Sequence, residues 1–284
     1  MIGTGPYNSL REYLTAVEAH GKLIKIDEID QDAYELTGFM YKLIDKYGWL
    51  DAPAVLVEKV KVSGEWMEGP ILINQYGMGG HEALVVGVPL DEIDPEDQIL
   101  NYKKSLQKML SEMPIEPMKT KEVTATDAPS KEIVLKGDEI DILSFPFIQT
   151  NPADNGRFIN TGNLITIDPD GGRNVGTYRM QIKGPRKIGI SPERNQDGWK
   201  ALMALKEKGE AHANVAVVLG AAPIVFAMSS SKTARSGQDE LEIAGGFKGE
   251  SVEVVKCEDS DIMVPANVEM IIEGEIPLDD FEEE

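Results

Sequence analysis

The sequence predicts a mixed α+β fold, an N-terminal α/β unit followed by a mixed sheet or partly closed β-barrel with helices packed outside. Two observations predict it. Residues 8–113 alternate amphipathic helical runs with short strands, whereas short strands separated by turn signals dominate beyond residue 130. The segment between them, 114–130, is rich in proline, lysine, threonine and aspartate, as domain connectors are. We therefore expect domains at residues 1–115 and 116–284.

In the first unit, residues 8–21 predict an amphipathic helix that Gly21 ends, and His20, just before that glycine, is expected at the surface. The glycine-rich segment 77–81 lacks dinucleotide-binding spacing, so we expect a mobile loop rather than a phosphate cradle. The remaining elements expected here are strands at 23–29, 54–60 and 71–75 and helices at 31–47 and 94–113.

The second unit reads as short strands interrupted by two helical segments. This alternation predicts a mixed sheet or a partly closed barrel with helices packed outside, and the sequence contains no internal repeat. The expected strands are 132–135, 161–167, 174–182, 214–219, 251–256 and 268–273, and the expected helices lie near 196–208 and 237–244.

Composition narrows the class of protein. The 284 residues are 42% apolar and 27% charged, which is ordinary for a globular protein. A count of 28 Lys+Arg against 49 Asp+Glu gives a net charge of −21, which disfavours nucleic-acid and membrane-surface binding. The single cysteine, Cys257, lies in a strand-like run and is expected to be a buried thiol. With no signal pattern and no membrane-spanning apolar run, we expect a cytoplasmic protein.

Residues 173–181 carry polar groups that a fold alone does not require. They follow a hairpin turn signal at 169–172. Asn174 offers a neutral oxygen ligand and Arg179 a planar fork suited to carboxylate or phosphate. In an ideal strand these two side chains point to opposite faces, unless Gly176 introduces a bulge. The alternative is an asparagine at a turn exit and a surface arginine.

Familiar catalytic signatures such as the Walker loop, G-x-G-x-x-G, G-x-S-x-G and H-E-x-x-H do not occur. Pro223 follows a strand and a Gly-Ala-Ala run, so it marks a helix start whose backbone N–H groups can receive an anion. The run 229–232 has small side chains that allow close backbone approach, and Lys232 can meet a negative charge. Glu240 opens the next helical segment, where a simple interaction with the helix dipole is the alternative reading.

Several segments, taken in their order along the chain, resemble those of the UbiD family of reversible decarboxylases, which use prenylated FMN. The resemblance covers about residues 120–284 and is looser over the first third. It implies a flavin-reductase-like split β-barrel cofactor domain after the N-terminal domain. The matching segments are 154–159 (DNGRFI), 173–181 (RNVGTYRMQ), 215–223 (VAVVLGAAP), 239–240 with 244–245, 254–257, 264–266, Glu269 and 273–274.

The resemblance implies reversible non-oxidative decarboxylation or carboxylation of an aromatic or α,β-unsaturated acid, with CO₂ as the other partner. Asn174 and Glu240 are expected to bind Mn²⁺ or Mg²⁺, and carbonyl groups around 229–232 a K⁺ ion. Arg179 is expected to pair with the substrate carboxylate and a catalytic acid. A flavin prenyltransferase would supply the cofactor, and a homo-oligomer or multi-subunit complex is expected. The residues expected at the cofactor are Asn174, Thr177, Tyr178, Arg179, Ser191, Pro192, Ser229, Ser230, Lys232 and Glu240.

Two departures from the family pattern matter. The histidine ligand expected fifteen to twenty residues after the arginine is absent from 191–196, where Glu193 or Asn195 is a possible substitute. Glu284 is a candidate for the first residue of the segment that carries the catalytic acid, and the alternative is that the acidic end is a solvated tail. The following acid and the C-terminal oligomerisation domain lie beyond the match. These departures predict a truncated or split form that is inactive alone. Alternatives are a non-catalytic flavin-binding subunit of a multi-subunit carboxylase and, ranked last, a flavin oxidoreductase.

Overall fold

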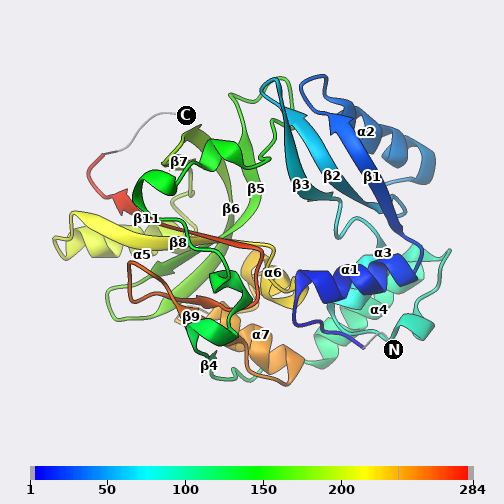
Figure 1. Ribbon diagram of the computed structural model, residues 1–284. Helices are drawn as coiled ribbons and strands as arrows, with labels where there is room; N and C mark the ends of the chain where they lie inside the picture. The colour runs from blue at the N-terminus through cyan, green and yellow to red at the C-terminus, as the bar shows by residue number, and fades with distance from the viewer. Residues whose placement is uncertain (1–3, 236, 281–284) are drawn as a thin grey trace.

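The computed structural model describes residues 4–235 and 237–280, which form three sheets with helices around them (Figure 1). The N-terminal sheet has the order β1-β2-β3, with β1 parallel to β2 and β3 antiparallel to it. Because β1 and β2 are parallel, a crossover must join them, and a helix supplies it. This part comprises α1 (Leu10–Ala19), β1 (Leu23–Asp30), α2 (Glu35–Tyr47), β2 (Ala54–Val62), β3 (Glu65–Ile73), α3 (Gly79–Val85), η1 (Leu90–Glu92) and α4 (Gln98–Ser111).

A five-stranded antiparallel sheet in the order β11-β8-β5-β6-β7 forms a curled half-barrel. One face packs on α5, and the other packs on α6 and α7. The predicted mixed α+β fold with a partly closed barrel is therefore confirmed. Its elements are β5 (Phe158–Ile167), β6 (Arg173–Gly184), β7 (Lys187–Ile190), α5 (Asp197–Glu207), β8 (His212–Leu219), α6 (Pro223–Ser230), α7 (Glu240–Lys248) and β11 (Met270–Pro277).

A small third sheet, in the order β10-β9-β4, closes the end of the molecule near α7 (Figure 1). Its strand β4 belongs to the predicted connector 114–130, and it pairs with β9 in parallel. Four short 3₁₀ turns lead from this strand to β5. The elements are β4 (Lys121–Glu122), η2 (Ala125–Asp127), η3 (Pro129–Lys131), η4 (Gly137–Glu139), η5 (Ile142–Ser144), β9 (Glu253–Lys256) and β10 (Met263–Pro265).

The largest hydrophobic cluster takes residues from both sides of the connector. Tyr13 and Leu84 from the N-terminal part are fully buried in it, as are Ile165 and Leu241 from the later part. Cys257 is 5% exposed in the same cluster, so the predicted buried thiol is confirmed. Shared burial of this kind holds the N-terminal helices against the half-barrel. In residues 4–235 and 237–280, no helix is long and apolar enough to cross a bilayer.

Three local predictions were wrong. Residues 132–135 form no strand and instead belong to the segment of short 3₁₀ turns between β4 and β5. The helix expected from residue 31 begins only at Glu35, since Tyr34 has a left-handed backbone (φ 56°) that cannot continue a helix. The predicted loop 77–81 instead opens the buried helix α3, where Gly79 lets α4 approach: a Cβ there would lie 1.9 Å from the Gln98 carbonyl oxygen.

Candidate active site

Strand β6 carries most of the predicted site residues, and its register explains how they face. Pairing with β5 is regular from Arg173 to Tyr178, so Gly176 makes no bulge. The irregularity lies instead on β5, between Ile159 and Gly162. Side chains alternate along the regular part of β6, so Asn174 and Arg179 lie on opposite sides of the sheet.

A hollow of about 570 Å³ opens beside the middle of β6. Four residues predicted at the cofactor line it: Thr177, Tyr178, Arg179 and Ser191. The other lining residues come from the loop before β5, the start of β5, β6 itself and the segment after β7. They are Ala153, Asp154, Asn155, Phe158, Gln181, Glu193 and Gln196.

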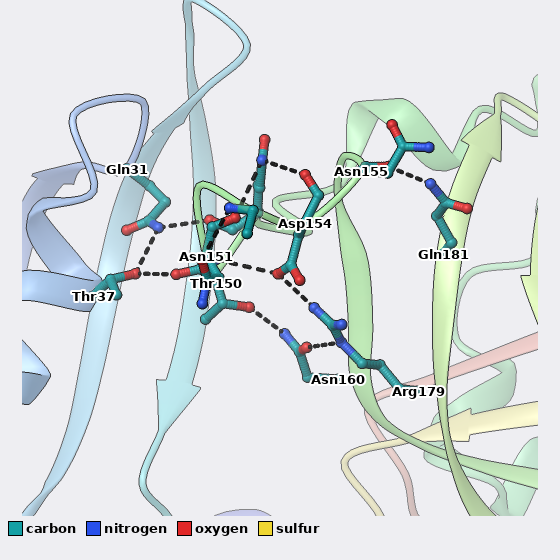
Figure 2. A network of polar contacts seen from close by, with 11 residues as sticks. Gln31, Thr37, Thr150, Asn151, Asp154, Asn155, Asn160, Arg179 and Gln181 are labelled. Carbon is teal, nitrogen blue, oxygen red and sulfur yellow. Dashed lines mark hydrogen bonds and ion pairs between the residues drawn. The ribbon is translucent and has the colours of Figure 1, made fainter. Parts of the chain in front are cut away.

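Arg179 is held at the edge of this hollow by three neighbours, of which Figure 2 shows Asp154 and Asn160. Its Nη2 donates to Asp154 Oδ2 at 2.5 Å, and its Nε donates to Asn160 Oδ1 at 3.1 Å. The guanidinium carbon lies 3.8 Å from the centre of the Phe158 ring, a cation–π distance. The planar group is therefore fixed both by the ring and by two hydrogen bonds in its own plane.

Thr177 connects the hollow to helix α6. Its hydroxyl lies 2.8 Å from Ser230 Oγ and 3.3 Å from Ser229 Oγ. Buried Asn163 on β5 donates to both Thr177 Oγ1, at 2.9 Å, and Ser229 Oγ, at 2.7 Å. Pro223 begins α6 as expected and places these serines at the end of that helix. The result is a group of hydroxyls and one amide suited to hydrogen-bonding a polar ligand.

Glu240 approaches β6 from α7, at the part of the strand that β7 leaves unpaired. The Val175 N–H donates to Glu240 Oε2 at 2.8 Å, next to Asn174. Burial raises the pKa of Glu240 to about 7, and the hydrogen bond from Val175 only partly opposes this. Burial also raises the pKa of Tyr178, whose hydroxyl meets the Gly198 backbone at the start of α5. Glu240 is thus a half-buried carboxylate whose charged neighbours, Asp239 and Asp197, are acidic.

Asn174 keeps one polar atom available beside this carboxylate. Its Nδ2 donates to Thr166 Oγ1 at 3.3 Å, and its Oδ1 accepts no hydrogen bond from the part of the chain that the structure describes. An amide oxygen and a carboxylate are donors that Mg²⁺ and Mn²⁺ accept. These two residues fit a partial divalent-metal site, although the described ranges contain no group of three or more His, Cys, Asp or Glu that could hold a metal.

The remaining predicted residues are less closely placed. Lys232 is exposed beyond the end of α6 and makes no ion pair with any described residue. Pro192 follows Ser191 without lining the hollow, whereas Glu193, one suggested substitute for the missing histidine, does line it. Glu284, the proposed catalytic acid, lies outside the described residues.

Sequence reasoning missed Asp154, Asn160 and Asn163 as site residues. Asn163 carried a usable signal, because a polar side chain in the otherwise apolar run 163–167 needs a buried partner. Asp154 lies in the DNGRFI segment that contributed to the family resemblance, but its contact with Arg179 spans 25 positions of sequence. Asn160 meets Arg179 at the irregular part of β5, which the sequence does not reveal.

The chain is similar to known proteins along nearly its whole length. The chain is 29% identical over 275 residues to a phenolic acid decarboxylase of Bacillus subtilis (strain 168), covering 95% of this chain and 54% of the relative. It is 29% identical to the UbiD-class enzyme HmfF from Pelotomaculum thermopropionicum, solved with FMN, with a TM-score of 0.77 and coverage of 95% and 55%.

Vanillic acid decarboxylase from Sedimentibacter hydroxybenzoicus, solved in an open form, gives a TM-score of 0.80 at 26% identity, with coverage of 95% of this chain and 55% of that one. The chain thus spans about half the length of the relatives it matches. The model of the UbiD family, 3-octaprenyl-4-hydroxybenzoate carboxy-lyase Rift-related domain, matches residues 121–284. That match covers more than half of the sequence, so the chain belongs to the UbiD family.

Proposed function

We propose that the hollow beside β6 serves the reversible non-oxidative decarboxylation or carboxylation of an aromatic or α,β-unsaturated carboxylic acid. The observation that carries this proposal is the oriented Arg179 guanidinium at the edge of the hollow. A planar cation of this kind matches a carboxylate, and the adjacent Phe158 ring suits an aromatic neighbour. The similarity to phenolic acid and vanillic acid decarboxylases supports this substrate class.

We propose prenylated FMN as the cofactor, delivered by a flavin prenyltransferase. Thr177, Ser229 and Ser230 offer hydroxyls for its polar groups, and Tyr178 and Ser191 line the same hollow. The relative HmfF has been solved with FMN and, in an evolved dimeric form, with prenylated FMN. When bound, this cofactor supplies the electron sink for loss of CO₂, and the protein supplies orientation and proton transfer.

The metal proposal rests on Asn174 and Glu240. The half-buried Glu240, whose pKa is raised to about 7, forms no ion pair with any described residue, and a divalent ion would supply a positive charge there. Mn²⁺ or Mg²⁺ suits the two oxygen donors, with the cofactor phosphate as a further ligand. A K⁺ ion near the carbonyls of 229–232 belongs to the same proposal.

In this scheme Arg179 binds and orients the substrate carboxylate, while the wall formed by Tyr178 and Phe158 keeps the substrate plane fixed. Glu284 is the proposed proton donor, on the family resemblance alone. We also propose the division into an N-terminal α/β domain (1–115) and a cofactor domain (116–284). A homo-oligomer or a multi-subunit complex is proposed as the working assembly.

The test is to co-express the chain with a flavin prenyltransferase and to record its absorbance and mass spectra. Purified protein is then assayed for CO₂ release from phenolic acids, beside an Arg179→Lys control that keeps the charge but loses the fork. Bound prenylated FMN is expected, and any turnover should fall about a hundredfold in Arg179→Lys. A folded chain without any flavin would overturn the cofactor proposal. Bound flavin without turnover fits both the predicted form that is inactive alone and the non-catalytic flavin-binding subunit.

A further inference from the structure

A short segment, 149–154, lies between the N-terminal sheet and the half-barrel (Figure 2). On the N-terminal side, Thr37 Oγ1 donates to the Thr150 carbonyl oxygen at 2.8 Å. Gln31 Nε2 donates to the Gln149 carbonyl oxygen, also at 2.8 Å, and to Thr37 Oγ1 at 3.0 Å. Gln31 is only 3% exposed, so this connection is shielded from water.

On its other side the same segment reaches Arg179 by two routes. Asn160 Nδ2 donates to Thr150 Oγ1 at 3.2 Å, which leaves Asn160 Oδ1 to accept from Arg179 Nε at 3.1 Å. Asp154 accepts from Arg179 Nη2 through Oδ2, and that oxygen also accepts from the Asn151 N–H at 3.2 Å. Asp154 is further tied by its carbonyl oxygen, which accepts from Gln149 Nε2 at 2.7 Å.

The arrangement divides the donors of the guanidinium into two sets. An arginine has five N–H donors in a fixed plane. Asn160 and Asp154 take two of them, along the edge shared by Nε and Nη2. The other three, on Nη1 and Nη2, have no partner among the described residues. One edge of Arg179 is therefore used for fixing the side chain, and the other is left for a ligand.

The exposed fractions of the Asp154 and Arg179 side chains also indicate that Asp154 holds the arginine in place. The Asp154 side chain is 14% exposed and the Arg179 side chain is 45% exposed, so the carboxylate is the inner partner of the pair. A carboxylate that merely screened the arginine at the surface would be the more exposed of the two. Asp154 instead lies in a loop that its own hydrogen bonds hold in place.

We propose that Asp154 and Asn160 are positioning residues for Arg179, and that the N-terminal α/β unit sets their place through Thr37 and Gln31. The inference rests on the proposed function, in which Arg179 receives the substrate carboxylate. Fixing Arg179 in advance lowers the entropy lost when that carboxylate binds. Loosening the segment 149–154 at Thr37, on the far side from the hollow, thus weakens carboxylate binding.

If Asp154 instead competes with the substrate carboxylate for Arg179, the expected change in affinity has the opposite sign. If this carboxylate occupied Arg179 as a competitor, a substrate would have to displace it, and removing its charge would tighten binding. Under the positioning role, removing it weakens binding. The sign of the change in affinity therefore decides between them.

The binding experiment uses the full chain loaded with FMN, titrated with benzoate by calorimetry, with phenol as a probe that lacks the carboxylate. Asp154→Asn is expected to weaken benzoate about tenfold and Thr37→Val about threefold, with phenol unchanged. Asp138→Asn, which removes an exposed partner of Arg186, is the matched control and should change nothing. Unchanged or tighter benzoate binding by Asp154→Asn would overturn the inference.

A second readout needs neither cofactor nor substrate. The Arg179 Nε–H signal in a ¹H–¹⁵N spectrum is assigned by its loss in Arg179→Lys. Its exchange with water should quicken about fivefold or more in Asn160→Ala and measurably in Thr37→Val, with both folds intact by circular dichroism. Equal exchange rates in the wild type, Asn160→Ala and Thr37→Val would contradict the positioning role of Asn160 and Thr37. If wild type and Arg179→Lys bind benzoate alike, the proposed carboxylate role fails instead, and the exchange result still decides the positioning.

Discussion

Two groups of polar side chains in this chain are held in place in different ways. Along β6, Arg173, Thr177 and Arg179 each have partners at hydrogen-bonding distance. Where α1 meets α3, His81 is fully buried, yet neither of its ring nitrogens has a partner in the described residues, and the same holds for Nε2 of His20. The first group is held in place by hydrogen bonds. The second is held mainly by packing, with the Lys22 backbone close to the His81 ring.

The second arrangement follows from close helix packing at glycine. A Cβ on Gly80 would lie 3.2 Å from His20 Nε2, so α3 and the end of α1 approach closely there. His20, which was expected at the surface, is therefore half-buried, and its Nε2 is covered. Burial lowers the pKa of His81 to about 3, with neighbouring His20 adding to the effect, and burial lowers the pKa of His20 as well. Both rings are therefore neutral at pH 7.

The largest expected effect comes from breaking a partnered pair on β6. Arg173 donates through Nε and Nη2 to Asp239, and the two side chains are 10% and 17% exposed. Asp239→Ala leaves the arginine charge unpaired and removes the N-cap of α7, so it should lower the free energy of unfolding by about 3–5 kcal/mol. Urea denaturation measures this.

The matched control is Asp138→Ala, which removes the fully exposed partner of Arg186. Its effect should fall below about 1 kcal/mol, because water already solvates both charges. If the two substitutions cost the same, partnering along β6 is no more important than an ion pair at the surface.

The next largest effect is the pH dependence of the free energy of unfolding that His81, packed beside His20, is expected to cause. The folded pKa of His81 is about 3, below the value of about 6.5 in an unfolded chain, so unfolded protein binds the extra proton first. The contribution of His81 to the free energy of unfolding is complete above pH 6.5 and is lost as the pH falls, by about 2 kcal/mol between pH 7 and pH 5. Unfolding curves at several pH values measure the slope.

His81→Leu should flatten this slope, since it removes the titrating group. His212→Gln, which removes an exposed histidine, should leave the slope as it is in the wild type. Lys22 adds a positive charge near His81 and Glu82 is a neighbouring carboxylate, so both stay unchanged in every variant. An equally steep slope in His81→Leu would assign the loss to other groups.

The polar side chains of β6 and the pair His20 and His81 also show which features the sequence can predict. Strand β6 follows from local pattern, a turn signal and alternating residues, so Asn174 and Arg179 were found. The partners of Arg179 were not, because Asp154 and Asn160 reach it through a loop and an irregular strand register. Burial of His81 depends likewise on how closely two helices pack. Contacts set by tertiary packing leave little trace in local sequence.

A smaller effect is expected at a partnered hydroxyl. Thr177→Val keeps the shape of the side chain but removes the acceptor that receives Asn163 Nδ2 at 2.9 Å. Asn163 is 1% exposed and cannot turn to water, so the loss should be about 1 kcal/mol in the free energy of unfolding. Thr15→Val, at an exposed helical hydroxyl, is the control and should stay nearer to zero.

The smallest effect is expected at a hydroxyl that has no partner. The Ser130 Oγ is buried and, within the described ranges, makes no hydrogen bond. Ser130→Ala removes a group that burial has already deprived of water, so the free energy of unfolding should stay within about 0.5 kcal/mol of the wild type or rise. Thermal and urea unfolding beside Thr177→Val give the comparison directly. A loss at Ser130 as large as that at Thr177 would mean that an ordered water, rather than packing alone, satisfies this hydroxyl.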